Sequence, residues 1–107
     1  MGLFGLFGSK TSHKNISKKV VNHIQTLGAP KEIGTEEHRI KFLTMLKNLN
    51  YWAEENKLGD WKRSAIAGEI EGIFRTTYRN TGYDDVVQEY VNLSRKIIMD
   101  LSKDYNW

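Results

Sequence analysis

The sequence predicts an all-α protein, a small antiparallel helical bundle of three long helices and a shorter N-terminal helix, preceded by a hydrophobic N-terminal arm. Three observations predict it. Apolar residues recur with the helical period in four successive segments, and glycines and capping residues separate these segments. The chain of 107 residues contains a single proline, Pro30. Because a proline inside a helix costs about 3 kcal/mol, its scarcity favours helices.

The first helix is predicted at about residues 15–27. Its apolar positions are separated by four, four and three residues, which places them on one helical face. They are Ile16, Val20, Ile24 and Leu27. Gly28, followed by Ala29 and Pro30, supplies the end of this helix.

The second helix is predicted to run from Thr35, a good N-cap residue, to about Asn56. Glu36 and Glu37 lie in its first turn, where the helix dipole favours acids. Its apolar stripe covers about half of the circumference. The stripe consists of Phe42, Leu43, Met45, Leu46, Leu49, Trp52 and Ala53. In the short connection that follows, Gly59 suits the end of one helix and Asp60 the N-cap of the next.

The third helix, at about residues 61–80, has two different faces. The large apolar residues are Ile66, Ile70, Ile73, Phe74 and Tyr78. The small-residue face consists of Ser64, Ala65, Gly68 and Gly72. Two glycines inside a helix cost together about 2 kcal/mol relative to alanine. We therefore expect another helix to pack closely on the small-residue face.

The fourth helix is predicted at about residues 85–103, with Asp84 or Asp85 as its cap. β-Branched residues are frequent in it, but the 3.6-residue period persists over five turns and indicates a helix. Because the connections between the long helices are short, neighbours are expected to be antiparallel. The chain then divides into an arm and linker, residues 1–14, and one bundle domain, residues 15–107.

The N-terminal arm is the segment that the bundle pattern does not accommodate. Its large apolar residues are Leu3, Phe4, Leu6 and Phe7, and the basic residues that follow are Lys10, Lys14, Lys18 and Lys19. No acidic residue precedes Glu32. This composition is typical of an interfacial docking segment. Burying the four apolar side chains gives roughly 6–12 kcal/mol, while ordering the segment costs about 7–14 kcal/mol, so we expect weak, conditional docking. The alternative is an arm that packs on its own bundle.

The sequence contains no recognisable catalytic, cofactor-binding or metal-binding motif. The absence of cysteine excludes thiolate chemistry, and His13, His23 and His38 do not have helical metal-ligand spacing. Isolated histidines on polar helix faces are expected to be solvated. Arg75 and Arg79 lie four residues apart and could together hold a phosphate or carboxylate. A solvated face with partners on a neighbouring helix is the favoured interpretation of this pair.

The leading functional hypothesis is a non-enzymatic helical interaction and assembly module that docks through the arm. Its expected partner is a protein subunit or a second copy of the chain, with an anionic membrane surface as the alternative. Two further alternatives are nucleic-acid binding through the basic N-terminal third and a small helical enzyme with a site between helices. No apolar run approaches about 18 residues and no secretory signal is apparent. We therefore expect a cytoplasmic protein, peripheral at a membrane or inside a larger assembly, and not secreted.

Overall fold

The computed structural model describes residues 11–99 of the chain. Within these residues it contains four α-helices, one 3-10 helix and no strand. The elements are α2 (His13–Gln25), η1 (Pro30–Glu32), α3 (Glu36–Glu55), α4 (Asp60–Thr77) and α5 (Asp84–Ile98). The predicted all-α class is confirmed. The hydrophobic residues of the arm and the last part of the predicted fourth helix lie outside the described residues.

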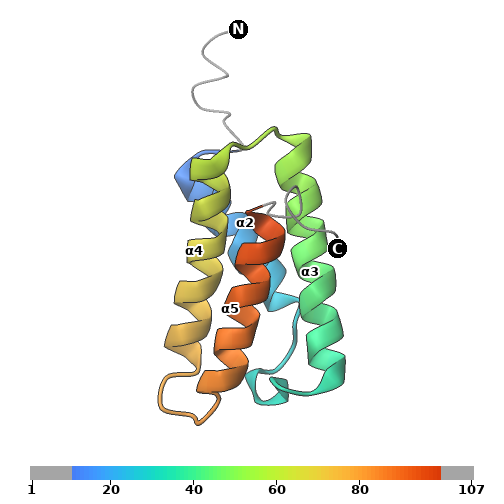
Figure 1. Cartoon of the computed structure of the whole chain (residues 1–107), viewed down its shortest axis with the longest axis vertical. Coiled ribbons are helices and arrows are strands. Elements are labelled where there is room, and N and C mark those ends of the chain that lie inside the picture. The colour runs from blue at the N-terminus through green and yellow to red at the C-terminus, as the bar shows by residue number, and fades with distance from the viewer. Residues whose placement is uncertain (1–10, 100–107) are drawn as a thin grey trace, which may run out of the picture.

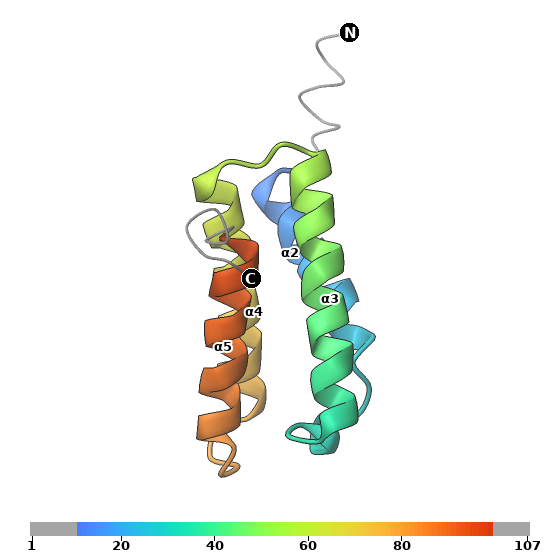
Figure 2. The ribbon, with the colours of Figure 1, turned by 45° about the vertical axis from the view of Figure 1, so that its right-hand side comes forward.

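The four helices occupy the corners of a bundle. In Figure 1 the chain runs down α2, up α3, down α4 and up α5, and Figure 2 shows the same arrangement from the side. α4 packs against α2 and α5, and α3 packs against α5 and α2. α3 and α4, although consecutive, therefore lie on a diagonal. A four-residue connection reaches about 14 Å, which spans the diagonal of a bundle whose adjacent axes are about 8–10 Å apart. The expectation that a short connection makes two helices packing neighbours fails for this pair.

The core is centred on stacked aromatic rings. The ring centroids of Phe42 and Tyr90 lie 4.1 Å apart in a stacked arrangement. Phe74 meets both rings edge-on, at 5.4 Å from Phe42 and 5.6 Å from Tyr90. Aliphatic side chains from all four helices surround this cluster and are almost completely buried. They include Ile16, Val20, Leu46, Leu49, Ile66, Ile70, Val91 and Ile98.

Side-chain caps mark where α2 and α3 begin. The hydroxyl of Thr35 accepts a hydrogen bond from the backbone N–H of His38 at 3.1 Å, so the predicted start of α3 is confirmed. Ser12 does the same for α2 by accepting from the N–H of Asn15 at 3.2 Å. This cap explains why α2 begins two residues before the predicted position.

The end of α3 differs from the expectation. Lys57, rather than a glycine, adopts the left-handed conformation, with φ of 53°. The N–H of Leu58 donates to the carbonyl of Ala53 and the N–H of Lys57 to that of Glu54, both at 3.0 Å. This pattern is a Schellman motif, and the burial of Leu58 supplies its usual hydrophobic contact. Gly59 then takes the N-cap position of α4 that the sequence analysis assigned to Asp60.

The small-residue face of α4 is open in the described part of the chain. Ser64, Gly68 and Gly72 are exposed, and Ala65 is half-buried at the edge of the core. A Cβ atom placed on Gly68 or Gly72 would meet no described atom within 4 Å. No described helix approaches Gly68 or Gly72 closely, whereas Ala65 packs against the core, so the described residues do not make the predicted close contact at the two glycines.

Replacing either glycine by alanine is expected to stabilise the isolated protein. Gly68→Ala and Gly72→Ala should each raise the free energy of unfolding by about 1 kcal/mol, since alanine costs less backbone entropy in a helix and nothing obstructs its methyl group. Urea unfolding followed by circular dichroism measures the change. Gly82→Ala is the control and should destabilise, because Gly82 has a φ of 87°. A loss of stability in the Gly68 or Gly72 variant would contradict an open face.

Candidate functional site

The structure places only part of the predicted docking segment. Leu3, Phe4, Leu6, Phe7 and Lys10 lie outside the described residues, which begin with Thr11 just before α2. Lys14 and Lys18 are exposed on α2, and Lys19 is half-buried. α2 contains no acidic residue, so the charged residues on its solvent-facing side are all basic.

An exposed tryptophan lies where the arm joins the bundle. Trp61, in the first turn of α4, is 90% exposed and is the most exposed large hydrophobic residue in the described part of the chain. The adjacent Lys62 donates from Nζ to the hydroxyl of Thr11 at 2.7 Å. Trp61, Lys62 and Thr11 line a shallow hollow of about 380 Å³ together with His13, Ile16, Ser64 and Ala65. Trp61 was not predicted as a site residue. It lies on a different side of the helix from Ile66 and Ile70, and this position indicated exposure.

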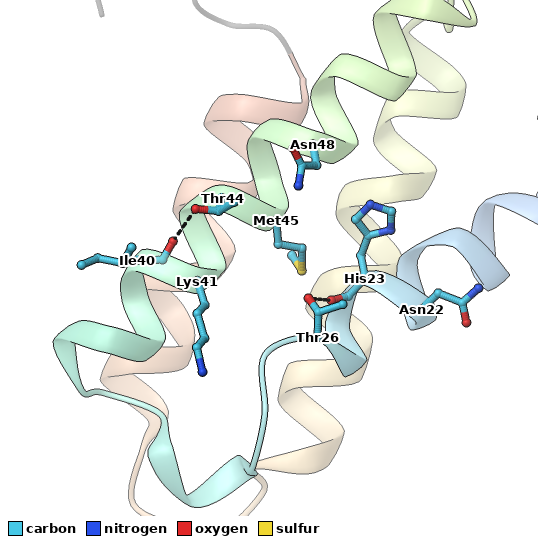
Figure 3. Close-up of a pocket in the computed structure, with 8 residues that line it drawn as sticks. All are labelled: Asn22, His23, Thr26, Ile40, Lys41, Thr44, Met45 and Asn48. Carbon is cyan, nitrogen blue, oxygen red and sulfur yellow. Dashed lines mark hydrogen bonds between the residues drawn. The ribbon is translucent and has the colours of Figure 1, made fainter.

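A second surface, here named the α2–α3 groove, follows the junction of these two helices. Its upper hollow, about 260 Å³, is lined by Asn15, Lys18, Lys19, Asn22 and Trp52. Its lower hollow, about 440 Å³, is lined by Asn22, His23, Thr26, Ile40, Lys41, Thr44, Met45 and Asn48 (Figure 3). Asn22 lines both, so the two hollows adjoin. Neither hollow has a carboxylate among its lining residues.

Several side chains of the α2–α3 groove are held by their own helices. The hydroxyl of Thr44 donates to the carbonyl of Ile40 at 3.0 Å, and that of Thr26 to the carbonyl of His23 at 2.6 Å (Figure 3). Nδ1 of His23 lies 2.9 Å from the carbonyl oxygen of Lys19, which can only accept, so Nδ1 carries a proton. The ammonium group of Lys19 lies 5.3 Å from the ring centroid of Trp52. These contacts orient the lining before any ligand arrives.

Arg75 and Arg79 are not brought together in a common site. Arg75 donates to Glu71 at 2.9 Å and to Gln88 of α5 at 2.8 Å. Arg95 also donates to Glu71, at 2.5 Å, and its hydrogen bond is the main cause that lowers the pKa of the Glu71 carboxyl. Arg79 follows the end of α4 and is exposed. Arg75 is thus engaged in an α4–α5 network rather than poised for an external anion.

His38 is a core residue and not a solvated one. It is 3% exposed, and its Nδ1 lies 2.8 Å from the hydroxyl of Tyr90, with the two rings stacked. Burial is the main cause that lowers the pKa of His38, while the nearby Glu32 opposes the shift. Burial also raises the pKa of Tyr90. The spacing of four residues between His38 and the core residue Phe42 was the sequence signal for this position.

Arg63 is the second buried polar residue that sequence reasoning missed. It is 6% exposed, and its Nη1 donates to the amide oxygen of Asn50 and to the carbonyl of Ile98, each at 2.7 Å. Its Nε donates to the carbonyl of Leu58 at 3.3 Å. The guanidinium group therefore joins α3, the α3–α4 connection and the C-terminal end of α5. A cation at that end also compensates the helix dipole of α5.

The comparisons with known proteins leave the site to be interpreted from its geometry. No protein-family model, no curated protein and no solved structure matches this chain. Among residues 11–99, no group of three or more potential metal ligands is present. None of the helices in that range has the length and apolar character needed to cross a bilayer.

The buried His38 should make stability depend on pH. Because its pKa in the folded state lies below 6.5, the unfolded chain takes up a proton first as the pH falls. The free energy of unfolding should therefore decrease as the pH falls through about 6.5 toward the lower pKa of the folded state. His38→Gln should flatten this dependence in urea titrations. Val91→Ala, which removes buried volume without removing the imidazole, should keep the slope. An unchanged slope in His38→Gln would contradict the assignment.

Removing the buried guanidinium should be strongly destabilising. Arg63→Ala leaves the carbonyl of Ile98 and the amide of Asn50 without this donor, and we expect a loss of about 2–4 kcal/mol in the free energy of unfolding. Arg63→Lys should recover only part of it, because one ammonium group cannot reach the same three oxygens. The exposed Arg79→Ala is the control, with an expected change within about 0.5 kcal/mol. Equal effects in both alanine variants would refute this role.

Proposed function

We propose that this chain is a non-enzymatic helical interaction module that docks through its N-terminal arm onto a partner subunit of a larger complex or an anionic membrane surface. The observation that carries the proposal is the nearly complete exposure of Trp61 beside Thr11, where the arm joins the bundle. The docking surface then comprises the arm, Trp61 and the basic side of α2.

Trp61 supports docking because of its size and position. Tryptophan is enriched in the energetically dominant centres of protein interfaces and in the interfacial zone of membranes. The described core does not use its ring. The four large apolar residues of the arm come shortly before Thr11 in the sequence, and Thr11 lines the same hollow as Trp61. In this proposal the arm and Trp61 act together as one apolar contact region of the kind that marks an interaction surface.

The charges of α2 support an anionic target. Lys14 and Lys18 are exposed, and helix α2 has no acidic residue to offset them. Each lysine near an anionic lipid surface contributes about 1 kcal/mol, and the contribution falls as salt rises. The apolar arm and the lysines together predict weak and reversible attachment, which several copies in an assembly would strengthen.

The buried polar residues support a structural rather than a catalytic interior. His38 pairs with Tyr90, Arg63 binds three oxygens, and the hydroxyl of Ser94 donates to the carbonyl of Tyr90 at 2.8 Å. No buried side-chain nitrogen or oxygen in the described residues lacks a hydrogen-bond partner. Each polar group in this part of the interior therefore has a role in holding the fold.

Two variants test the docking surface. Deletion of residues 1–9 and the substitution Trp61→Ser should each weaken binding by about tenfold or more, since each removes buried apolar contact. The readouts are cosedimentation with phosphatidylserine-containing vesicles and self-association by light scattering. Tyr83→Ser is the matched control, because Tyr83 is a partly exposed aromatic residue at the N-cap of α5. α5 begins at the end of the bundle opposite to the start of α4 (Figure 1). Its binding should remain unchanged.

The two readouts distinguish the targets. Loss of vesicle binding identifies a membrane target, and loss of self-association identifies a second copy of the chain. The helical circular dichroism signal should persist in every variant. If deletion of residues 1–9 instead lowers the melting temperature by several degrees, the arm packs on its own bundle and the proposal is wrong.

A further inference from the structure

The α2–α3 groove follows the junction of the two helices along most of α2. Its lining runs from Asn15 to Thr26 on the α2 side and from Ile40 to Trp52 on the α3 side. Lys41 and Trp52 are eleven positions apart, which corresponds to about 16 Å along the helix. The groove is thus long enough for a short segment of an extended polymer. It shares Lys18 and Lys19 with the basic side of α2 but does not include Trp61.

From its charge and lining, we propose that the α2–α3 groove binds single-stranded nucleic acid. Lys18 and Lys19 line its upper part and Lys41 its lower part, and none of the lining residues is acidic. Glu37 lies 3.6 Å from Lys41, but both side chains are largely exposed, and such a pair is easily exchanged for a phosphate contact. The three ammonium groups form a track along which a phosphodiester backbone can run.

The polar lining offers hydrogen bonds to bases. The amides of Asn22 and Asn48 make no hydrogen bond with another described residue, so both donors and acceptors remain for a ligand. The hydroxyl protons of Thr26 and Thr44 are already used by their own helices, which leaves their oxygens as acceptors. Amides and hydroxyl groups of this kind recognise the edges of unpaired bases.

An exposed aromatic residue flanks the groove without lining its two hollows. Tyr51 is 67% exposed and lies three positions after the lining residue Asn48, which makes the two residues neighbours on the surface of α3. The ring of Trp52, which lines the upper hollow, lies 5.3 Å from the ammonium group of Lys19. Stacking of a base on an aromatic ring contributes about a five-fold or greater gain in affinity and requires little sequence preference. Tyr51 therefore gives the groove a contact that the lysines alone cannot provide.

The same features disfavour two other polyanions. An amphipathic acidic helix needs a row of apolar anchors, but Ile40 is the only large aliphatic side chain of the lining that is exposed, since Met45 is buried. A duplex hides the Watson–Crick edges and the faces of its bases, so a contact with its backbone alone would leave the amides and Tyr51 unused. A single strand uses the lysines, the amides and the aromatic ring together.

The test measures binding of the full chain to a fluorescent oligothymidylate of about 15 nucleotides by anisotropy. For a single strand, each phosphate contact contributes about −0.7 to the slope of log affinity against log salt concentration. Contacts from three lysines therefore predict a slope of about −2. Lys18→Gln combined with Lys41→Gln should weaken binding by about tenfold or more at about 50 mM salt. Tyr51→Ala should weaken it by about fivefold or more.

A matched double variant controls for net charge. Lys62→Gln combined with Arg79→Gln removes the same two charges from positions outside the groove, and its affinity should stay within about twofold of the unmodified chain. Trp61→Ser, which tests the docking surface, should also leave oligonucleotide binding unchanged. Failure of the docking proposal and failure of the groove proposal are therefore distinguishable.

Four results would overturn the groove proposal. They are absence of binding at about 50 mM salt, equal losses in the two double variants, tighter binding of a duplex than of the single strand, and no effect of Tyr51→Ala. Loss of vesicle binding in the groove variant, with oligonucleotide binding retained, would assign Lys18 and Lys41 to a membrane surface instead.

Discussion

The contact on which the structure most depends is the packing of the Tyr90 ring in the middle of the bundle. Tyr90 of α5 stacks on Phe42 and His38 of α3 and meets Phe74 of α4 edge-on. Its hydroxyl is paired with His38, so the largest fully buried side chain has both its apolar and its polar requirements met. Because aromatic packing is directional, this cluster sets how α3, α4 and α5 lie relative to one another.

The short α2 occupies the remaining corner and borders both candidate surfaces. Ile16 and Val20 anchor it in the core. Along its length, α2 lines the α2–α3 groove together with α3. At its N-terminal end, α2 begins beside the first turn of α4, which brings Thr11 into contact with Lys62 and next to Trp61. Both candidate surfaces therefore include residues of α2 or next to it.

Helices and caps were largely predictable, whereas buried polar residues were not. The apolar period and the Thr35 cap located α3 because both signals lie within a few residues of one another. The burial of His38 and Arg63 was not predicted, because a hydrophobic pattern treats polar residues as exposed. Their hydrogen-bond partners are also distant in the sequence: Tyr90 lies 52 residues from His38, and Ile98 lies 35 residues from Arg63. The left-handed conformation of Lys57 was not predicted for a different reason. Glycine is the usual residue just after the C-cap of a helix, and Gly59 was close by.

The sequence by itself determined the all-α class, the helical segments and the concentration of positive charge before Glu32, because periodicity, capping and charge are local properties. Only the tertiary structure decided that α3 and α4 lie on a diagonal and that Gly68 and Gly72 face open space. The physical reason is that an apolar stripe specifies which side of a helix is buried, but not which other helix buries it. That choice depends on the combined fit of all four helices around one core.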